Sequence, residues 1–370
     1  MNPDIERDAP HQLVLTHLSR RRFLVGVGAA AAAAAFLAAC SGDDDGEPSS
    51  TATGTAAGAA TDTPTIAPTQ HAAGFVFTDA RGITVELPER PVRIVAQVSA
   101  AAALWDFGIR PVGIFGPQRN ADGSNGPQVG DVDLSTVTSL GENWGEFDLE
   151  AFAELQPDIL ISTAYAGADP LWYVPEDAQP VIDQLCPSVG IEVQGVPVVG
   201  IIQRFEDLAV QLGADLDTSE VVQAKQDFGT AEAELVAAIA AKPGITAMAV
   251  SANQEMVYIA NPALAHDLLW FRELGMDILI PPIPADQWWE ELSWELVGAH
   301  DTEVDLILLD QRTQALTEAQ MAERELWPQL KAVAAGQVGP WYAETTYSWK
   351  GFTPAINDTV AALLAAEDIV

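Results

Sequence analysis

The residues of this chain whose types could do chemistry are mainly aromatic. Most of the ten tryptophans fall in segments that we expect to be loops after strands rather than on helix faces. A tryptophan brings a large apolar face and one hydrogen-bond donor, which suits a bulky ligand of mixed polarity. With nearby tyrosines and one arginine as a polar clamp, they give the candidate ligand-binding set Trp144, Tyr165, Trp172, Tyr173, Trp288, Trp289, Arg312, Trp341 and Tyr342. The alternatives are that some of the tryptophans pack in the core and that Arg312 is an ordinary surface residue.

Motifs for catalysis or metal binding are missing from the sequence. It has no Gly-x-Ser-x-Gly elbow, no His-Glu-x-x-His and no phosphate-binding glycine-rich loop. Beyond the N-terminal 39 residues the histidines are only His71, His266 and His300, whereas a zinc or manganese site needs three or four converging ligands. We therefore expect no enzyme, no catalytic residue, no bound metal and no resident cofactor.

The charge of the chain restricts its partners. There are 53 acidic residues against 17 lysines and arginines in 370 residues, which gives a formal charge of -36. Phosphate recognition needs clustered lysine and arginine, so we expect no nucleic-acid partner. The same shortage of cations favours a neutral or cationic ligand over an anionic one, and tryptophan adds attraction for a cation.

The first 39 residues are predicted to be a removable export signal. Arg20 and Arg21, followed by Phe23-Leu24, resemble a twin-arginine signal, with an ordinary secretory signal as the alternative. The apolar run that follows is short and alanine-rich. A permanent membrane helix, which needs about 20 apolar residues, is therefore the weaker interpretation.

A lipid anchor is predicted directly after this signal. Leu37-Ala38-Ala39-Cys40 resembles a bacterial lipobox, in which the cysteine is acylated and becomes the new N-terminus; a chance buried cysteine is the alternative. Such an anchor would hold the protein at the outer face of the cytoplasmic membrane, at the cell surface or in the periplasm. Residues 40–73 are rich in Ser, Thr, Ala, Gly and Pro and are predicted to be a disordered tether.

The remaining chain shows strand–helix–strand patterns on both sides of one long helix. Residues 75–77 and 83–87 alternate around a glycine turn and predict a β-hairpin. Apolar residues at spacings of three and four predict a helix over 219–241, which ends at Lys242-Pro243-Gly244. Helices are also predicted over 292–299 and 352–366. We predict an α/β protein with an N-terminal lobe at 74–217, a linker helix at 218–243 and a C-terminal lobe at 244–370.

Several segments resemble the iron-siderophore substrate-binding lipoproteins of ABC importers. The likeness spans roughly 75–365, and the segments that carry it are Phe77–Pro88, Pro91–Val95, Gly141–Leu160 with Leu155-Gln156-Pro157-Asp158, Ser293–Leu296, Val304–Ile307 and Trp327–Val338. The resemblance implies two Rossmann-like lobes joined by a single long α-helix, with small motion between the lobes. It also implies a monomer that delivers its ligand to a permease and its ATPase. Acidic residues on each lobe would dock to the permease; Glu176 matches by position in one, and Asp267 or Glu273 are candidates in the other.

The resemblance also bears on the type of ligand. Hydroxamate-siderophore binders place a tyrosine where this chain has Tyr165, which makes Tyr165 the first candidate for ligand contact. Catecholate and carboxylate siderophores bind iron as anions, so the shortage of lysine and arginine makes a ferric hydroxamate the expected ligand. Relatives often supply an arginine where this chain has Asn143-Trp144, which is a departure from the pattern. Haem and cobalamin, carried by other members of the superfamily, are alternatives, and haem would need an axial ligand such as Tyr165, Tyr258, His266 or His300. A cell-envelope lipoprotein without a transport role is a further alternative.

Overall fold

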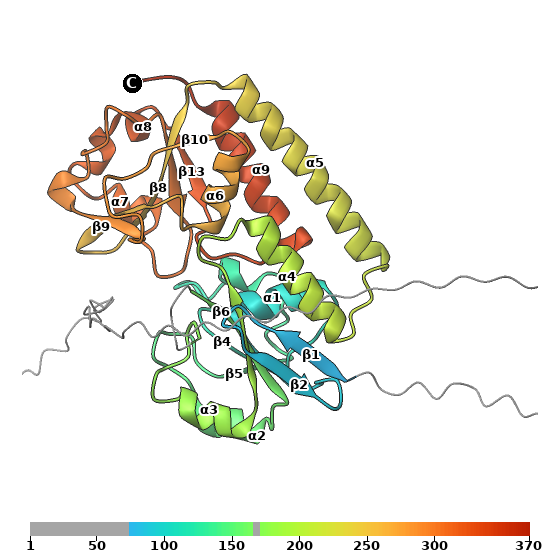
Figure 1. Cartoon of the computed structure of the whole chain (residues 1–370). Coiled ribbons are helices and arrows are strands. Elements are labelled where there is room, and N and C mark those ends of the chain that lie inside the picture. Colours follow the sequence, from blue (N-terminus) through green and yellow to red (C-terminus); the bar gives the residue numbers. More distant parts are fainter. Residues whose placement is uncertain (1–73, 166–170) are drawn as a thin grey trace, which may run out of the picture. The chain divides into compact units, whose positions relative to one another are not determined.

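The computed structural model describes residues 74–165 and 171–370 (Figure 1). The predicted signal peptide with Arg20 and Arg21, the predicted lipidation site Cys40 and the predicted tether at 40–73 lie outside these residues. All described residues belong to one compact unit. Within them, none of the helices has the length and apolar character that crossing a membrane requires. The division at 217 and 243 stays a prediction.

The N-terminal half contains a hairpin and a fully parallel sheet. The antiparallel hairpin pairs β1 (Phe75–Thr78) with β2 (Thr84–Leu87), as predicted. The five-stranded sheet has the order β5-β4-β3-β6-β7, with β3 (Ile94–Gln97), β4 (Gly113–Phe115), β5 (Thr138–Ser139), β6 (Ile159–Ala164) and β7 (Ser188–Glu192). Every residue of β3 and β6 is buried, as expected for parallel strands that are covered on both faces. The helices of this half are α1 (Val98–Asp106), α2 (Leu149–Glu154), α3 (Gln179–Leu185) and α4 (Val198–Gln211), with a 3-10 turn at Pro127–Val129.

The C-terminal half is built on a mixed sheet. Its order is β11-β9-β8-β12-β13, with β10 also paired to β8. The strands are β8 (Thr246–Ala252), β9 (Met256–Ala260), β10 (Asp277–Ile278), β11 (Trp289–Ser293), β12 (Leu306–Asp310) and β13 (Val338–Trp341). The pairs of β8 with β9 and of β9 with β11 are antiparallel, and the others are parallel. Its helices are α6 (His266–Glu273), α7 (Glu318–Met321), α8 (Lys331–Ala334) and α9 (Trp349–Ala365), with 3-10 turns at Trp294–Leu296 and Trp327–Gln329.

The predicted helix over 292–299 is wrong. Residues up to Ser293 belong to β11, and only one 3-10 turn follows at Trp294–Leu296. In β11, Leu292 pairs with Val257 of β9 and is buried under the sheet. Tertiary pairing of an aromatic-rich segment thus overrides a short pattern that also fits a helix.

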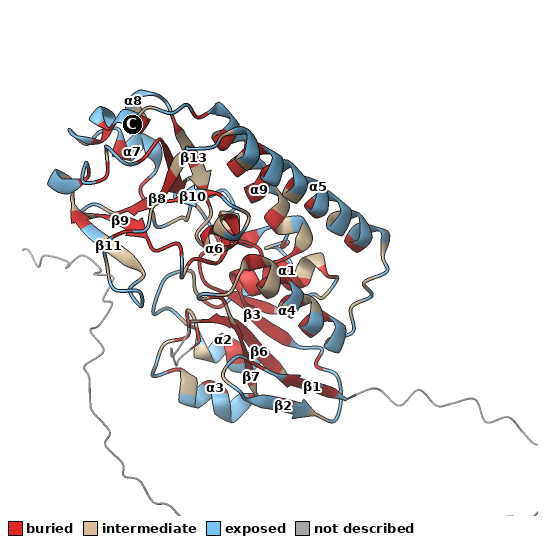
Figure 2. Cartoon of the chain, turned by 45° about the horizontal axis from the view of Figure 1, so that its top comes forward, coloured by how far each residue is buried: buried red, intermediate tan, exposed pale blue. Residues whose placement is uncertain are grey.

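The long helix predicted from the apolar spacing is confirmed. Helix α5 covers Ser219–Ala241, 23 residues, and is therefore about 34 Å long. Thr218 caps its N-terminus by accepting a hydrogen bond from the Val221 amide. Helix α5 buries one face against α9 and exposes the other (Figures 1 and 2). In this contact the Phe228 ring lies 5.0 Å from the Trp349 ring and 6.5 Å from the Phe352 ring.

The segment that enters α9 bonds to the N-terminal half. Ser348 donates to Asp106 at the end of α1, and Lys350 forms an ion pair with Asp131. Trp349 donates through Nε1 to Glu206 of α4. The largest apolar cluster also contains buried residues of α1, α4, α5, α6 and α9. The described parts of both halves therefore share one core.

Cys186 is a buried, unpaired thiol. It lies at the C-terminal end of α3 with 5% of its surface exposed. Burial, with repulsion from Asp158 and Asp183 as smaller causes, raises the pKa of its thiol to about 12. The thiolate is therefore scarce at neutral pH, which makes Cys186 chemically inert.

Candidate ligand-binding site

Four of the predicted aromatic residues meet in the N-terminal half. Tyr165 directly follows β6, Trp144 lies in the loop between β5 and α2, and Trp172 and Tyr173 follow further along the chain. The ring of Trp172 is central, because its centroid lies 4.5 Å from Tyr165, 4.8 Å from Trp144 and 5.6 Å from Tyr173. Trp144 is 60% exposed, so this group reaches the surface.

Three further aromatic residues meet in the C-terminal half, and one contact joins the two groups. Trp288 precedes β11, Trp289 is its first residue and Trp341 ends β13. The ring centroids of Trp288 and Trp289 are 6.3 Å apart, and those of Trp289 and Trp341 are 6.0 Å apart. The Tyr165 and Trp288 rings meet edge to face at 5.6 Å. We call these seven side chains the aromatic cluster: Trp144, Tyr165, Trp172, Tyr173, Trp288, Trp289 and Trp341.

Tyr173 is held in an uncommon backbone conformation. Its φ is +62°, in the left-handed region that is costly for a residue with a β-carbon. Its ring contacts Trp144 at 5.3 Å as well as Trp172. Strain of this kind persists where surrounding contacts fix the residue, and it is concentrated at binding sites.

Arg312 is not a free clamp in this structure. It lies two residues after β12, and its side chain is 15% exposed. Its Nε and Nη2 each lie 2.8 Å from Oδ2 of Asp310, and its Nη1 lies 3.0 Å from Oε1 of Glu344. Burial alone would lower the pKa of Arg312, but attraction to the two carboxylates outweighs it and raises the pKa above its ordinary value. The guanidinium is therefore charged and already paired on two sides.

Glu344 and Gln128 are site residues that the sequence reasoning missed. Glu344 is 3% exposed, and its Oε2 accepts a hydrogen bond of 3.3 Å from Nε2 of Gln128, which is fully buried. After burial itself, repulsion from Glu344 is the next cause that raises the pKa of both Tyr165 and Tyr173. Glu344 thus lies close enough to influence the aromatic cluster. No sequence signal marks it among 53 acidic residues, because its partners are far apart in the chain.

Three predicted residues have partners that give them other roles. Tyr342 donates its hydroxyl to Asp358 of α9 at 2.7 Å and is therefore committed to that helix. Trp341 is 2% exposed and donates from Nε1 to Asp267 at 2.7 Å, so it is a buried neighbour of Trp289 whose only side-chain hydrogen-bond donor is already used. Asp267 is itself 2% exposed. It offers no surface carboxylate to a permease, which corrects its assignment as a docking residue; Glu176 and Glu273 are exposed.

Asp267 and the adjacent His266 have opposite pKa shifts. Burial raises the pKa of Asp267 from 3.8 to about 7, although hydrogen bonds from the Leu268 amide and Trp341 lower it in part; Asp310 adds repulsion. Burial lowers the pKa of His266 from 6.5 to about 4, against a smaller opposing effect of Glu344. The His266 ring lies edge to face on Tyr347, at 5.1 Å. His266 is therefore neutral near pH 7, and with 2% of its surface exposed it is enclosed in the core rather than presented to a ligand.

An Asp267→Asn substitution is expected to change how stability depends on pH. The folded protein holds the Asp267 proton more tightly than the unfolded chain does, because the pKa of Asp267 is higher in the folded state. The contribution of Asp267 to the free energy of unfolding is therefore fully present below about pH 4 and is lost as the pH rises through 7. His266 acts in the opposite sense between pH 4 and 6.5, but it is present in both proteins and its effect subtracts out. Urea unfolding at several pH values measures this. Between pH 4 and 8 the free energy of unfolding of the variant should rise by about 3–4 kcal/mol relative to that of the wild type. A difference that stays constant with pH would contradict the raised pKa.

The described residues offer no metal site. Among 74–165 and 171–370 there is no group of three or more His, Cys, Asp or Glu side chains placed to hold a metal ion. His300 bonds instead to Glu290 through Nε2, at 2.6 Å, and to Glu303 through Nδ1, at 3.3 Å.

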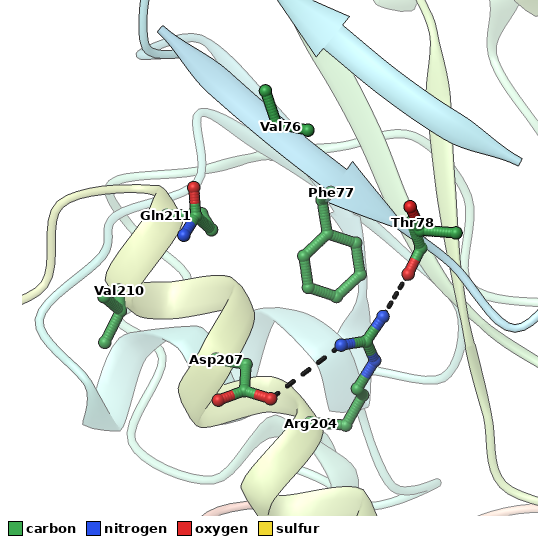
Figure 3. Close-up of a pocket in the computed structure, with 7 residues that line it drawn as sticks. All are labelled: Val76, Phe77, Thr78, Arg204, Asp207, Val210 and Gln211. Carbon is green, nitrogen blue, oxygen red and sulfur yellow. Dashed lines mark hydrogen bonds and ion pairs between the residues drawn. The ribbon is translucent and has the colours of Figure 1, made fainter. Parts of the chain in front are cut away.

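A surface pocket of about 410 Å³ lies between β1 and α4 (Figure 3). Figure 3 shows the Arg204 guanidinium beside the Phe77 ring, 4.1 Å from its centroid, and directed to the Thr78 carbonyl and to Asp207. None of the predicted ligand-binding residues lines this pocket. Because its arginine is already engaged, we assign it no part in ligand binding.

Comparison with known proteins decides the family. A family model described as periplasmic binding protein matches residues 96–344. The chain belongs to the periplasmic binding protein family. This is a family of binding proteins rather than enzymes, and it works outside the cytoplasm, as the sequence predicted. No curated protein matches the chain.

Solved structures of this family resemble the chain along most of its length. DesE, a ferric-siderophore receptor protein from Streptomyces coelicolor, is 38% identical with a TM-score of 0.77; the match covers 80% of this chain and 100% of that one. The siderophore periplasmic binding protein from the fuscachelin gene cluster of Thermobifida fusca is 21% identical, covers 74% and 96%, and has a TM-score of 0.53. FhuD from Vibrio cholerae, solved with Fe³⁺-Desferal, is 18% identical, covers 75% and 99%, and has a TM-score of 0.52. The last two share the periplasmic binding protein fold and support nothing finer.

Proposed function

We propose that the protein captures a ferric siderophore of the hydroxamate type and delivers it to the permease of an ABC importer. The observation that carries the proposal is the aromatic cluster, in which the contact of Tyr165, directly after β6, with Trp288, directly before β11, joins the two halves of the chain. A surface of this kind suits a bulky ligand with apolar arms and polar iron-binding groups. The 38% identity to a ferric-siderophore receptor supports the same ligand class.

The charges around the cluster favour a hydroxamate complex over a catecholate. Ferric catecholates are anions, whereas a ferric trishydroxamate shell is neutral, because three anionic groups balance Fe³⁺. Arg312, whose guanidinium lies 5.8 Å from the centroid of the Trp289 ring, is already paired with Asp310 and Glu344. An anionic ligand would meet carboxylates with no free cation at this position, which costs affinity.

The haem alternative has weaker support. A tyrosine that ligates haem iron does so as phenolate. Burial, followed by repulsion from Glu344, raises the pKa of Tyr165 well above its ordinary value, so the phenolate is disfavoured. His266 is enclosed, with 2% of its surface exposed.

A ligand titration tests the proposal. The purified protein is titrated with a ferric trishydroxamate, a ferric catecholate, haem and cobalamin while tryptophan fluorescence is followed. We expect saturable quenching by the trishydroxamate at low micromolar concentration or below, and weaker binding of the others. No saturable quenching by any of the four up to high micromolar concentration would reject the importer function. Saturation by haem or cobalamin alone would replace the ligand.

The same proposal includes two lobes joined by α5, with small motion between them. Its support is the length of α5, its packing along α9 and the bonds from Ser348, Trp349 and Lys350 to the N-terminal half. Small-angle X-ray scattering should therefore show little change in radius of gyration when ligand is added. A clear decrease would point to a hinge that closes.

Delivery in the cell depends on two further proposed residues. Cys40→Ala is expected to remove the lipid and release the protein from the membrane fraction, because the tether then has no anchor.

Glu176→Arg is expected to keep both the anchor and the ligand affinity but to lower iron uptake severalfold, since the exposed carboxylate would no longer meet permease arginines. Glu318→Arg, at another exposed acid, is the matched control. Membrane retention of Cys40→Ala, or normal uptake with Glu176→Arg, would reject the respective role.

A further inference from the structure

The neighbourhood of Arg312 carries more negative than positive charge. The ends of the paired strands β12 and β13 bring Asp310 and Trp341 side by side, and the loops that follow supply Arg312 and Glu344. One guanidinium lies between two carboxylates, Asp310 at 2% exposure and Glu344 at 3%. With all three groups ionised the sum is one net negative charge. Because the carboxylates are buried, solvent ions screen this excess only weakly.

A second observation points from this group toward a ligand. The Nε2 of Gln128 donates to Glu344, but its Oε1, which is also buried, has no hydrogen-bond partner among the described residues. A buried polar atom without a partner costs stability, and in a native structure it calls for an explanation. Here an unused acceptor lies beside a carboxylate, an arrangement that suits a donor carrying positive charge.

Glu344 lies one residue away from the aromatic cluster: it binds Arg312 at 3.0 Å, and the Arg312 guanidinium lies 5.8 Å from the centroid of the Trp289 ring. Besides burial, repulsion by Glu344 disfavours the phenolates of Tyr165 and Tyr173, which are neighbours of Trp172 and Trp144. The negative charge of Glu344 that repels a phenolate would attract a cation held on the aromatic cluster. The tryptophan faces also attract a cation. This attraction does not depend on how far the cation lies from Glu344.

We propose that Glu344 is a specificity-determining residue, which makes the site select siderophore complexes bearing a cationic group over neutral and anionic ones. This rests on the proposed function, because it concerns the ligand of the same site. Asp310 balances Arg312, and Glu344 supplies the unbalanced charge. A ligand ammonium near the aromatic cluster is attracted by it, and a ligand carboxylate is repelled.

The test uses three ferric trishydroxamates with the same iron shell. One carries a pendant primary ammonium, the second has that amine acetylated, and the third has it succinylated, so their net charges are +1, 0 and -1. The wild-type protein is expected to bind the ammonium form about tenfold more tightly than the acetylated form, and the succinylated form more weakly still. This measurement needs no variant; equal affinities, or a preference for the neutral or anionic form, would overturn the proposal.

Variants then assign the preference to Glu344. Glu344→Gln keeps the size and one acceptor of the side chain, and Arg312 retains Asp310 as its partner, so we expect it to fold; thermal unfolding checks this. Its affinities for the ammonium and acetylated forms are expected to become nearly equal, mainly by loss of affinity for the former. Glu323→Gln, at an exposed acid outside this group, should keep the tenfold preference.

The outcomes separate this inference from the function on which it rests. If all three complexes bind but Glu344→Gln retains the tenfold preference, or loses affinity for all three equally, Glu344 does not select charge and the inference is wrong. If none of the three gives saturable quenching of the wild type, the proposed function fails, and the inference fails with it.

Discussion

Trp144→Ala is expected to weaken binding of a ferric trishydroxamate about 10- to 30-fold while leaving the fold intact. Trp144 is 60% exposed and yet in contact with the rings of Trp172 and Tyr173, so its indole is offered to a ligand rather than needed for the core. Loss of an aromatic contact with the ligand is expected to cost about 1.4–2 kcal/mol of binding free energy, which corresponds to the stated factor. The exposed indole buries little area, so the free energy of unfolding should change by less than about 1 kcal/mol.

Fluorescence titration and urea unfolding on the same samples check this result. Trp294→Ala is the matched control, because Trp294 lies in a 3-10 turn outside the aromatic cluster and contacts Arg324 instead. Its affinity should equal that of the wild type. Unchanged affinity in Trp144→Ala would show that the ligand does not use this part of the cluster.

Arg312→Gln is expected to destabilise the protein by about 3–5 kcal/mol. The substitution leaves Asp310 and Glu344 buried without their common cation, and breaking a buried ion pair from one side costs this much. Arg119→Gln, at an exposed arginine, should change stability by no more than about 0.5 kcal/mol. Urea unfolding measures both.

A double variant identifies the source of the loss. When Glu344→Gln is added to Arg312→Gln, one of the two stranded charges disappears, so the pair should be more stable than the sum of the single effects predicts. Strict additivity would mean that Arg312 and Glu344 do not interact as the geometry indicates. A loss below about 1 kcal/mol in Arg312→Gln would mean that Arg312 is available to the ligand after all.

Local sequence patterns predicted those helices and strands for which several independent signals in the sequence agree. For α5, the apolar spacing and the Lys242-Pro243-Gly244 stop point to the same helix, and the structure has it at Ser219–Ala241. The segment 292–299 has a pattern too short to decide, and its pairing with β9 made its first residues a strand. Pairing with a distant strand is a tertiary effect that no local window contains.

The candidate site likewise has residues that the sequence could predict and residues that only tertiary contacts bring together. The aromatic residues stand out by type and by their position near strand ends, so the cluster could be expected from the sequence. The partners of Arg312 could not, because Asp310 and Glu344 become neighbours only through the register of β12 against β13. Burial of Asp267 was equally hidden, since its side-chain partner Trp341 lies 74 residues further along the chain.

Cys186 makes the protein suitable for optical measurement. In the part of the chain that the structure describes it is the sole thiol, and its burial and high pKa keep it from reacting with maleimide dyes near neutral pH. In a protein whose Cys40 is replaced, a cysteine introduced at an exposed position such as Glu176 would therefore take up a single label without removal of Cys186. Emission from that label could report ligand capture separately from the ten tryptophans.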